Sequence, residues 1–552
     1  MKQVAPNRMK YKQITNPWSS RFTIDYYNFN NTIHSLYEYN PFDDQSYVKR
    51  ISYLEGRENL AHRQELVQIL RSFHAPELLH PKVEYNLQRL SQSDSVVVIG
   101  GQQAGLMTGP MYTIHKAITI IQIAHNEEKK LGRPVIPVFW IAGEDHDLDE
   151  VDHVWIQDDR AQLVKHRLDY EDKGKYPISS LKIKPEQLHI WLAELSKLLP
   201  DSPYKQEWLK RCTSLITEPI SWTRYFARLM HDLFGKWGLI LIDSSDLALR
   251  KFEVSFFQKL LEKNQILSEK VAKAATQFEK LGYDVPVELS DQKAHLFIHA
   301  DGERHLLYRD QDEWFTKEGQ HRFSTEQIIK ILHDSPEKFS NNVLTRPLMQ
   351  EFLFPTLVFV GGGSEVAYWG LLKEAFLEMG LQMPIVFPRP SMTIVDRRVQ
   401  KRMEQFQLTW SDLVSDLEKK KDEWLEHQTH VDFSAMFDDL KLKTEELYQP
   451  LIKILKKEVG MDLNQMAEKN KQKVWEQIDF LAQYTERQFT LKHQTVLRRW
   501  DELISTLSPR KRPQERVLNL LSFWNRHGLE WIDQVISDPF IHRENHLQLI
   551  IM

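Results

Sequence analysis

The stretch that decides the fold reads Ser95-Val96-Val97-Val98-Ile99-Gly100-Gly101-Gln102-Gln103-Ala104-Gly105. A short β-branched run leads into a glycine-rich turn, and apolar residues at helical spacing follow it, namely Ile114, Ala117, Ile118, Ile121 and Ala124. A second apolar run, Val135 to Ile141, comes next. This order of strand, glycine-rich turn, helix and strand predicts the opening of a parallel sheet whose strands are buried on both faces.

The same pattern returns further along the chain. A helix expected from Thr223 to Phe234 leads to the apolar run Leu239 to Asp243. Later, Leu357 to Val360 enters three consecutive glycines, a helix is expected from Val366 to Met379, and the apolar run Pro384 to Phe387 follows. The strands of one sheet are therefore expected to come from segments far apart in sequence.

These segments predict an α/β protein made of a core, insertions and an arm. The core is expected from residues 1–155, 219–249 and 336–396, with residues 156–218 and 250–335 as insertions into it. Residues 397–508 are expected to form a helical arm, and residues 509–552, which are mixed and aromatic, to pack back on the sheet.

The predicted arm contains one proline and one glycine. Leu440, Leu447, Leu451 and Ile454 are spaced by 7, 4 and 3 residues, which is typical of long helices that pack along a seam. Gly460 is a natural point for the chain to reverse. We predict an antiparallel helical hairpin that also forms the contact between two copies, with an ordinary helical domain as the alternative.

Composition excludes several classes of protein. The 552 residues include 72 basic and 77 acidic side chains, a balance that argues against general nucleic-acid binding. The single cysteine, Cys212, excludes an internal disulfide framework and a thiolate-ligated metal. No apolar run approaches the ~18 residues of a membrane span, and Met1 to Pro6 lack the features of a leader peptide. We expect a cytoplasmic protein with neither a membrane nor a nucleic-acid partner.

The first candidate site is the glycine-rich stretch after the opening strand. Its backbone and neutral donors could hold a phosphate or carboxylate, and we assign this role to Gly101, Gln102, Gln103, Gly105, Thr108 and Gly109. His115 and Lys116, at the start of the following helix, are candidate catalytic residues. The stretch matches neither a Walker A loop nor G-x-G-x-x-G, and tight turns for packing remain an alternative.

The second candidate site is acidic. Residues 144–153 carry six carboxylates and two imidazoles directly after a predicted strand. Repulsion within such a cluster favours a bound cation, either a divalent metal or a substrate ammonium group. Glu144 is assigned to binding, and Asp145, His146 and Asp147 to catalysis. A solvated acidic loop is the alternative.

The third candidate site follows the later strands. A second glycine-rich turn and the helix after it supply binding candidates Gly361, Gly362, Gly363, Ser364, Glu365 and Tyr368. Arg389 and Ser391 follow the next strand. Arg389 could bind an anion through two of its donors, and Arg346 could do the same. A helix cap with core aromatics, and surface arginines, are the alternatives.

Three long motifs together resemble the bacillithiol biosynthesis cysteine-adding enzyme family, BshC. They are the stretch from Val97 through Gly109-Pro110 to His115-Lys116, the stretch Phe139 to Asp147, and the stretch Val360 to Glu365. The resemblance covers essentially the whole chain. It implies a Rossmann-like core with connecting insertions and an antiparallel coiled coil that mediates homodimers. It also implies the last step of bacillithiol synthesis, in which L-cysteine is added to glucosaminyl malate through an amide bond. A pocket over the sheet for the malate-bearing substrate, and a nucleotide near the arm, are implied as well.

The core also resembles nucleotidylyltransferases and class I aminoacyl-tRNA synthetases. Their His-x-Gly-His signature is incomplete here, since only His115 is present, and Ser391-Met392-Thr393 lacks the lysine of their second loop. Amide formation from a free carboxylate nevertheless requires activation, so we expect ATP or another nucleotide as the co-substrate. A sugar-nucleotide enzyme on the same core, and a scaffold protein that acts through its arm, are the competing hypotheses.

Overall fold

The computed structural model describes residues 9–57, 60–170, 174–290, 292–317, 320–414, 416–538 and 546–552. Met1 to Pro6, on which the expectation about a leader peptide rests, lie outside the described residues. The chain divides into two compact units. The first contains residues 1–159, 163–397 and 512–552, and the second contains residues 160–162 and 398–511.

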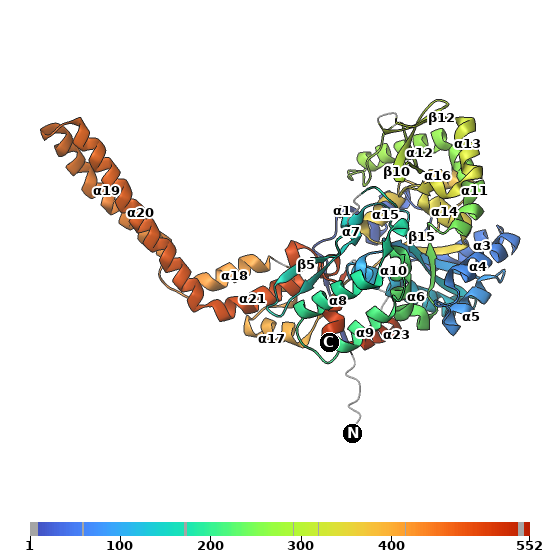
Figure 1. Cartoon of the computed structure of the whole chain (residues 1–552), viewed down its shortest axis with the longest axis horizontal. Helices are drawn as coiled ribbons and strands as arrows, with labels where there is room; N and C mark the ends of the chain where they lie inside the picture. The colour runs from blue at the N-terminus through green and yellow to red at the C-terminus, as the bar shows by residue number, and fades with distance from the viewer. Residues whose placement is uncertain are drawn as a thin grey trace, which may run out of the picture. The chain divides into compact units, whose positions relative to one another are not determined.

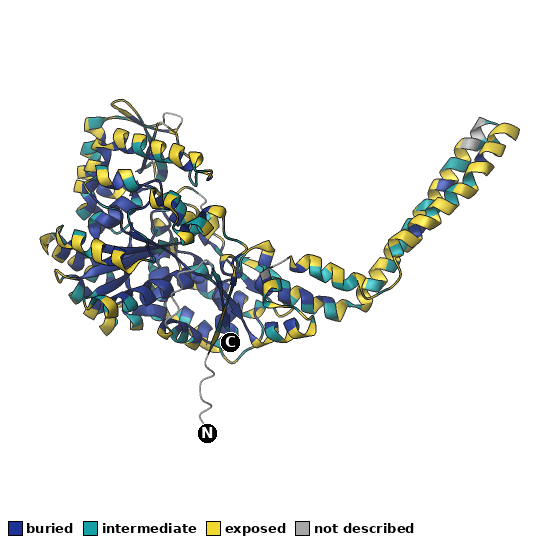
Figure 2. Cartoon of the chain, turned by 180° about the vertical axis from the view of Figure 1, so that it is seen from behind, coloured by how far each residue is buried: buried dark blue, intermediate teal, exposed yellow. Residues whose placement is uncertain are grey.

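The centre of the first unit is a five-stranded sheet in the order β15-β14-β2-β3-β8, in which every neighbouring pair is parallel. The strands are β2 (Val96–Gln102), β3 (Val135–Ile141), β8 (Ile240–Asp243), β14 (Thr356–Gly361) and β15 (Ile385–Pro388). Figure 2 shows these strands as buried, and every residue of β3, β8, β14 and β15 is. The predicted parallel sheet is thus confirmed.

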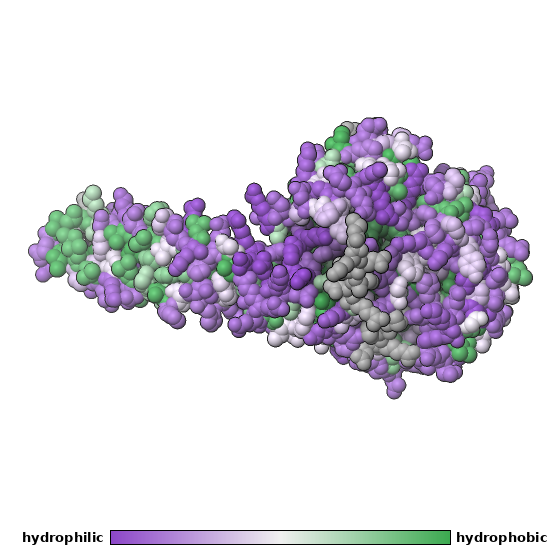
Figure 3. Space-filling view, turned by 90° about the horizontal axis from the view of Figure 1, so that it is seen from below, coloured by the Kyte–Doolittle hydropathy of each residue, from purple (hydrophilic) through white to green (hydrophobic). Residues whose placement is uncertain are grey.

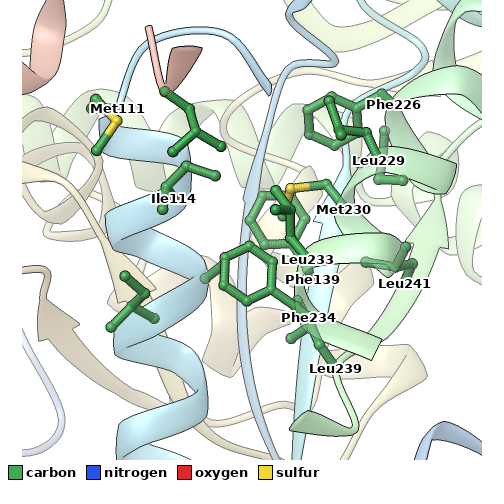
Figure 4. Packing of buried hydrophobic residues seen from close by; sticks show 14 of the residues in the cluster. Met111, Ile114, Phe139, Phe226, Leu229, Met230, Leu233, Phe234, Leu239 and Leu241 are labelled. Carbon is green, nitrogen blue, oxygen red and sulfur yellow. The ribbon is translucent and has the colours of Figure 1, made fainter. Parts of the chain in front are cut away.

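Alternate residues of β2 enter two different cores. Val96 and Val98 pack on one side of the sheet, whereas Val97 and Ile99 pack on the other. On the first side, α6 (Tyr112–Leu131) and α10 (Trp222–Phe234) cover the sheet, and Figure 4 shows Ile114 of α6 and Phe226 of α10 beside Phe139 of β3. Burial on both faces explains why the strands read as continuous apolar runs.

Two boundaries differ from those expected. Gly100 and Gly101 belong to β2 rather than to a turn, because the strands lie too close for side chains there. A Cβ on Gly100 would lie 2.7 Å from the Val360 carbonyl oxygen, and one on Gly101 would lie 2.5 Å from that of Trp140. The helix expected from Val366 to Met379 is two helices, α15 (Gly363–Trp369) and α16 (Lys373–Glu378).

Further elements surround the sheet. The N-terminal segment forms β1 (Lys10–Thr15), α1 (Arg21–Asn28), α2 (Asn31–His34), α3 (Asp44–Glu55), α4 (Leu60–His74) and α5 (Pro81–Leu90). After β3 come α7 (Leu148–Val151), β4 (His153–Gln157), β5 (Leu163–Arg167), β6 (Lys182–Ile183), α8 (Pro185–Leu198), α9 (Lys205–Ser214) and β7 (Ile220–Ser221).

The segment after β8 carries a second sheet, which Figure 1 shows in green and yellow. It is antiparallel, in the order β12-β11-β10-β9-β13. Its strands are β9 (Lys293–Ala300), β10 (Glu303–Asp310), β11 (Glu313–Thr316), β12 (Arg322–Ser324) and β13 (Phe339–Asn341), and the accompanying helices are α11 (Leu247–Glu262), α12 (Asn264–Lys280), α13 (Thr325–Asp334) and α14 (Arg346–Leu353). Strands β9 and β10 form a hairpin that turns at Asp301-Gly302.

The last residues of the chain return to the first unit. Helices α22 (Leu521–His527) and α23 (Glu530–Ser537) precede β17 (His546–Ile551). Strand β17 pairs in parallel with β16 (Ser391–Val395) and antiparallel with β1, which makes a small three-stranded sheet. Residues close to both termini therefore share one sheet.

The second unit is helical and contains a long hairpin. Its helices are α17 (Arg397–Gln405), α18 (Leu417–Glu426), α19 (Phe433–Glu458), α20 (Met461–Lys492) and α21 (Gln494–Leu507). The pairs Lys441–Asp479 and Lys471–Glu445 show that α19 and α20 run antiparallel, which confirms the coiled coil. The chain reverses at Gly460, whose φ of 119° favours glycine.

Apolar side chains remain exposed along this hairpin. Figure 3 shows them as green patches on its surface, and they include Leu442, Leu447, Ile454, Val459 and Met466. Elsewhere, Cys212 is fully buried and burial raises its pKa, in line with a structural role. Across the described residues, no helix combines the length and the apolar character needed to cross a membrane.

Candidate functional site

A cavity of about 260 Å³ opens at the carboxyl ends of β2, β3 and β14. This is where the chain order of the sheet reverses, since β3 follows β2 on one side while β14 lies on the other, and ligands bind at such points in open α/β sheets. The candidates that line it are Gly101, Gln102, Gln103, Lys116, Asp145, Arg346, Gly362, Ser364, Glu365, Tyr368 and Arg389. Residues from all three predicted sites therefore meet in one cavity.

Lys116 is the most buried charged group at this cavity, with 1% of its side chain exposed. Its Nζ donates to the Gly101 carbonyl oxygen at 2.6 Å, to Gln102 Oε1 at 3.1 Å and to Glu365 Oε2 at 2.5 Å. Burial lowers the pKa of Lys116, and the Glu365 carboxylate opposes that shift. Because these three bonds use all three ammonium protons, Lys116 serves as a fixed positive charge rather than as a base.

Glu365 presents a carboxylate to the cavity from the first turn of α15. Its Oε2 accepts the bond from Lys116 and a second bond, of 2.7 Å, from the backbone N–H of Gly362. Its Oε1 forms no hydrogen bond with any residue that the structure describes, and 27% of the side chain is exposed. The glycine-rich turn and the lysine thus hold one carboxylate oxygen and leave the other open.

Arg346 and Asp145 also line the cavity. Arg346 Nη2 lies 3.5 Å from Asp145 Oδ1, and its Nε lies 3.4 Å from Oε1 of the buried Glu144, which also pairs with Arg250. Burial would raise the pKa of Glu144, but Arg250 and Arg346 outweigh it and hold that pKa below its ordinary value. Burial would lower the pKa of Arg346, but Asp145 and Glu144 raise it. Arg346 therefore remains a cation.

His115 does not reach the cavity. It is fully buried, and its Nδ1 lies 2.8 Å from Glu515 Oε2. The same carboxylate accepts from Arg389 Nη1 at 2.8 Å, from Arg389 Nη2 at 2.7 Å and from the backbone N–H of Met392 at 3.0 Å. Arg389 lines the cavity, but both of its terminal nitrogens are engaged by Glu515.

Gly105, Thr108 and Gly109 also lie outside the cavity lining. A Cβ on Gly105 would lie 2.6 Å from the Cα of Gly109, so this turn is closed on itself. The side chain of Asn519 donates to the carbonyl oxygens of Met107 and Gly109, at 3.0 and 2.6 Å. The packing alternative therefore accounts for this part of the glycine-rich stretch.

The acidic cluster divides between two places. Asp145 and Glu144 belong to the network around Arg346, whereas His146 and Asp147 line a separate cavity of about 280 Å³. Burial and the neighbouring Arg304 lower the pKa of His146. Within the described part of the chain, no three His, Cys, Asp or Glu side chains are grouped to hold a metal ion.

The other candidates sit beside the cavity or away from it. Gly361 ends β14, and Gly363 begins α15, where its Cβ would lie 3.1 Å from Thr23 Oγ1. Ser391 begins β16, and none of these three lines the cavity. Sequence reasoning missed Arg516, which does line it. No local signal marks that residue, because the coiled coil separates it from the strands in sequence.

Comparison with known proteins places the whole chain in one family. Residues 9–390 match the N-terminal Rossmann-like domain of bacillithiol biosynthesis BshC, and residues 392–551 match its C-terminal coiled-coil domain. A relative from Bacillus cereus named "Putative cysteine ligase BshC" is 35% identical over 96% of this chain and 98% of its own length. Relatives of the same name from Geobacillus and Bacillus anthracis are each 34% identical, over 96% and 98% of this chain and 97% and 99% of their own lengths. The chain belongs to the BshC family of bacillithiol biosynthesis.

Proposed function

We propose that this protein is a cysteine ligase that joins L-cysteine to the amine of glucosaminyl malate, in the last step of bacillithiol synthesis. The observation that carries the proposal is one cavity lined by two ion pairs, Lys116–Glu365 and Arg346–Asp145. Its cations suit carboxylate groups, and its carboxylates suit an ammonium group and the proton that an amine must release. The relatives named as cysteine ligases support the same chemistry.

The reaction needs an activated carboxylate. ATP supplies it by transferring a phosphoryl group to a carboxylate oxygen of cysteine with release of ADP, or an adenylyl group with release of pyrophosphate. The sugar amine then attacks the carbonyl carbon, the new C–N bond forms, and the C–O bond to the phosphate or AMP breaks. We assign Glu365 Oε1 as the acceptor of the amine proton, because Oε2 is held by Lys116 and by the N–H of Gly362.

Arg346 suits the negative charge that develops on the carbonyl oxygen. It is held by two carboxylates and keeps its positive charge, so it is oriented before the reaction begins. Lys116 acts indirectly by holding the Glu365 carboxylate in place. His115 and the Gly105–Gly109 turn support the cavity from behind rather than contact substrate.

Reconstitution with the full-length protein tests this function. Glucosaminyl malate, L-cysteine, ATP and Mg²⁺ are incubated with the enzyme, and the amide product is measured by mass spectrometry with each component omitted in turn. We expect product only in the complete mixture. Absence of product with every nucleoside triphosphate contradicts the proposal, and release of pyrophosphate with a sugar phosphate in the absence of cysteine favours the sugar-nucleotide alternative.

We also propose that two copies associate through the α19–α20 hairpin. The exposed apolar residues Leu442, Leu447, Ile454, Val459 and Met466 give that hairpin a surface that a second copy would cover.

A further inference from the structure

The charges that line the cavity do not balance. Four basic side chains, Lys116, Arg346, Arg389 and Arg516, face two acidic ones, Asp145 and Glu365. Lys116 pairs with Glu365, Arg346 with Asp145 and Glu144, and Arg389 with Glu515 from behind. Among the residues that the structure describes, Arg516 is the lining cation that forms no ion pair. An anionic ligand group would supply the missing partner.

Arg516 stands on a rigid support although its own side chain is exposed. It ends a short 3-10 turn, Gln514–Arg516, whose other two residues are buried. Gln514 accepts from the N–H of Ile394 at 2.8 Å and donates to the carbonyl oxygen of Ile394 at 3.0 Å. Glu515 is fixed by Arg389 and His115. The backbone of Arg516 is therefore anchored on β16, and only its side chain is free to meet a ligand.

The surroundings of Arg516 favour a carboxylate. Tyr112 lines the same cavity, and its hydroxyl is protonated at neutral pH, since burial raises its pKa to about 12. A guanidinium and a phenol that line one cavity offer several donors for one planar anion. Arg389 is less suited to this role because Glu515 already occupies both of its terminal nitrogens.

We propose that Arg516 binds a carboxylate of the malyl group of the amino-sugar substrate, and so makes the enzyme select a sugar that carries this acid. The inference rests on the proposed function, because it takes glucosaminyl malate as the substrate. It assigns selectivity to a residue of the C-terminal segment, which follows the coiled coil in sequence and completes the cavity of the core.

Two sugars that differ only in the acid provide the test. Glucosaminyl malate is compared with methyl glucosaminide, which has the same amine and no carboxylate, in the wild type, Arg516→Gln and Arg516→Lys. Arg512→Gln is the matched control, because Arg512 is exposed, lies four residues away and does not line the cavity. The readouts are kcat/KM for each sugar, KM for cysteine, and the Kd of glucosaminyl malate by calorimetry without cysteine or nucleotide.

We expect Arg516→Gln to lower kcat/KM for glucosaminyl malate by roughly 10- to 100-fold, the range for one charge-assisted hydrogen bond, and to weaken its Kd similarly. Methyl glucosaminide and cysteine should be unaffected, Arg516→Lys should recover part of the loss, and Arg512→Gln should match the wild type. Unchanged binding of glucosaminyl malate, or an equal loss for both sugars, overturns the assignment. A wild type that binds glucosaminyl malate but forms no amide refutes the proposed function instead, and the calorimetry then still decides the role of Arg516.

Discussion

Glu515→Gln should strongly destabilise the first unit. The Glu515 carboxylate is 2% exposed and accepts four hydrogen bonds, two from Arg389 and one each from His115 and the backbone of Met392. Glutamine removes the charge and turns one acceptor oxygen into a donor that faces other donors. The buried Arg389 guanidinium then lacks its counter-ion, and breaking a buried pair in this way costs about 3–5 kcal/mol.

Urea unfolding followed by tryptophan fluorescence measures this loss, with Glu279→Gln as the control. Glu279 is exposed, so its substitution should change the free energy of unfolding by less than about 0.5 kcal/mol. Burial would raise the pKa of Glu515, but Arg389 and His115 hold that pKa far below its ordinary value. A carboxylate with a lowered pKa stabilises the fold above its unfolded pKa, so the loss should be equally large at pH 7 and pH 5.

A double-mutant cycle with Arg389→Met separates the ion pair from general damage. Removing both partners takes away the unpaired charge, so the double variant should lose less than the sum of the single losses, by about 1–3 kcal/mol. Two results refute the view that this carboxylate organises the back of the cavity. One is a free energy of unfolding for Glu515→Gln within about 0.5 kcal/mol of the wild type, and the other is strictly additive losses in the cycle.

Three further outcomes follow from the geometry. Gly101→Ala should destabilise the core by about 2 kcal/mol or more in urea unfolding, because the new Cβ would lie 2.5 Å from the Trp140 backbone. Gly380→Ala is the control: its Cβ would meet nothing within 4 Å, so it should cost only the backbone strain of about 1 kcal/mol. Burial raises the pKa of Asp243 to about 6, so ionisation of this carboxyl destabilises the fold as the pH rises from 4 to 6. Asp243→Asn should therefore remove the fall in the unfolding midpoint over this pH range. A midpoint that still falls in the variant contradicts the assignment of this pH dependence to Asp243. Leu447→Asp combined with Ile454→Asp should convert a dimer to a monomer, as measured by light scattering. Lys453→Asp, on the same helix, is the control and should leave the dimer intact. A wild type that is already monomeric contradicts association through the hairpin.

The sheet could be predicted because its signal is local. Val96 to Ile99 and Val135 to Ile141 are apolar at every position, which is what burial on both faces demands. The coiled coil could be predicted in the same way, because apolar residues recur along its helices at the spacing of a packing seam. The role of Gly100 and Gly101 could not be predicted, because a glycine that lets two strands approach each other and a glycine in a ligand-binding loop give the same sequence pattern.

The candidate site could be predicted only in part, for a different physical reason. Lys116, Glu365 and Asp145 each follow a predicted strand, so the rule that parallel strands end at one edge brings them together. His115 is next to Lys116 in sequence, yet the rotation of about 100° between successive helix residues directs it to Glu515, 400 residues away. Arg516 reaches the cavity, and Glu515 lies behind it, only through the packing of the C-terminal segment against β16, which no local pattern encodes.

The most direct test of the central claim is the rate of amide formation by Glu365→Gln. Glutamine keeps the size of the side chain and the acceptor for the Gly362 N–H but cannot take the proton of the amine, and Glu374→Gln on the exposed face of α16 is the control. We predict that Glu365→Gln forms amide roughly 10²- to 10⁴-fold more slowly at saturating substrate, measured per mole of folded enzyme, while the control matches the wild type. Amide formation by Glu365→Gln at the wild-type rate would contradict the placement of the chemistry in this cavity.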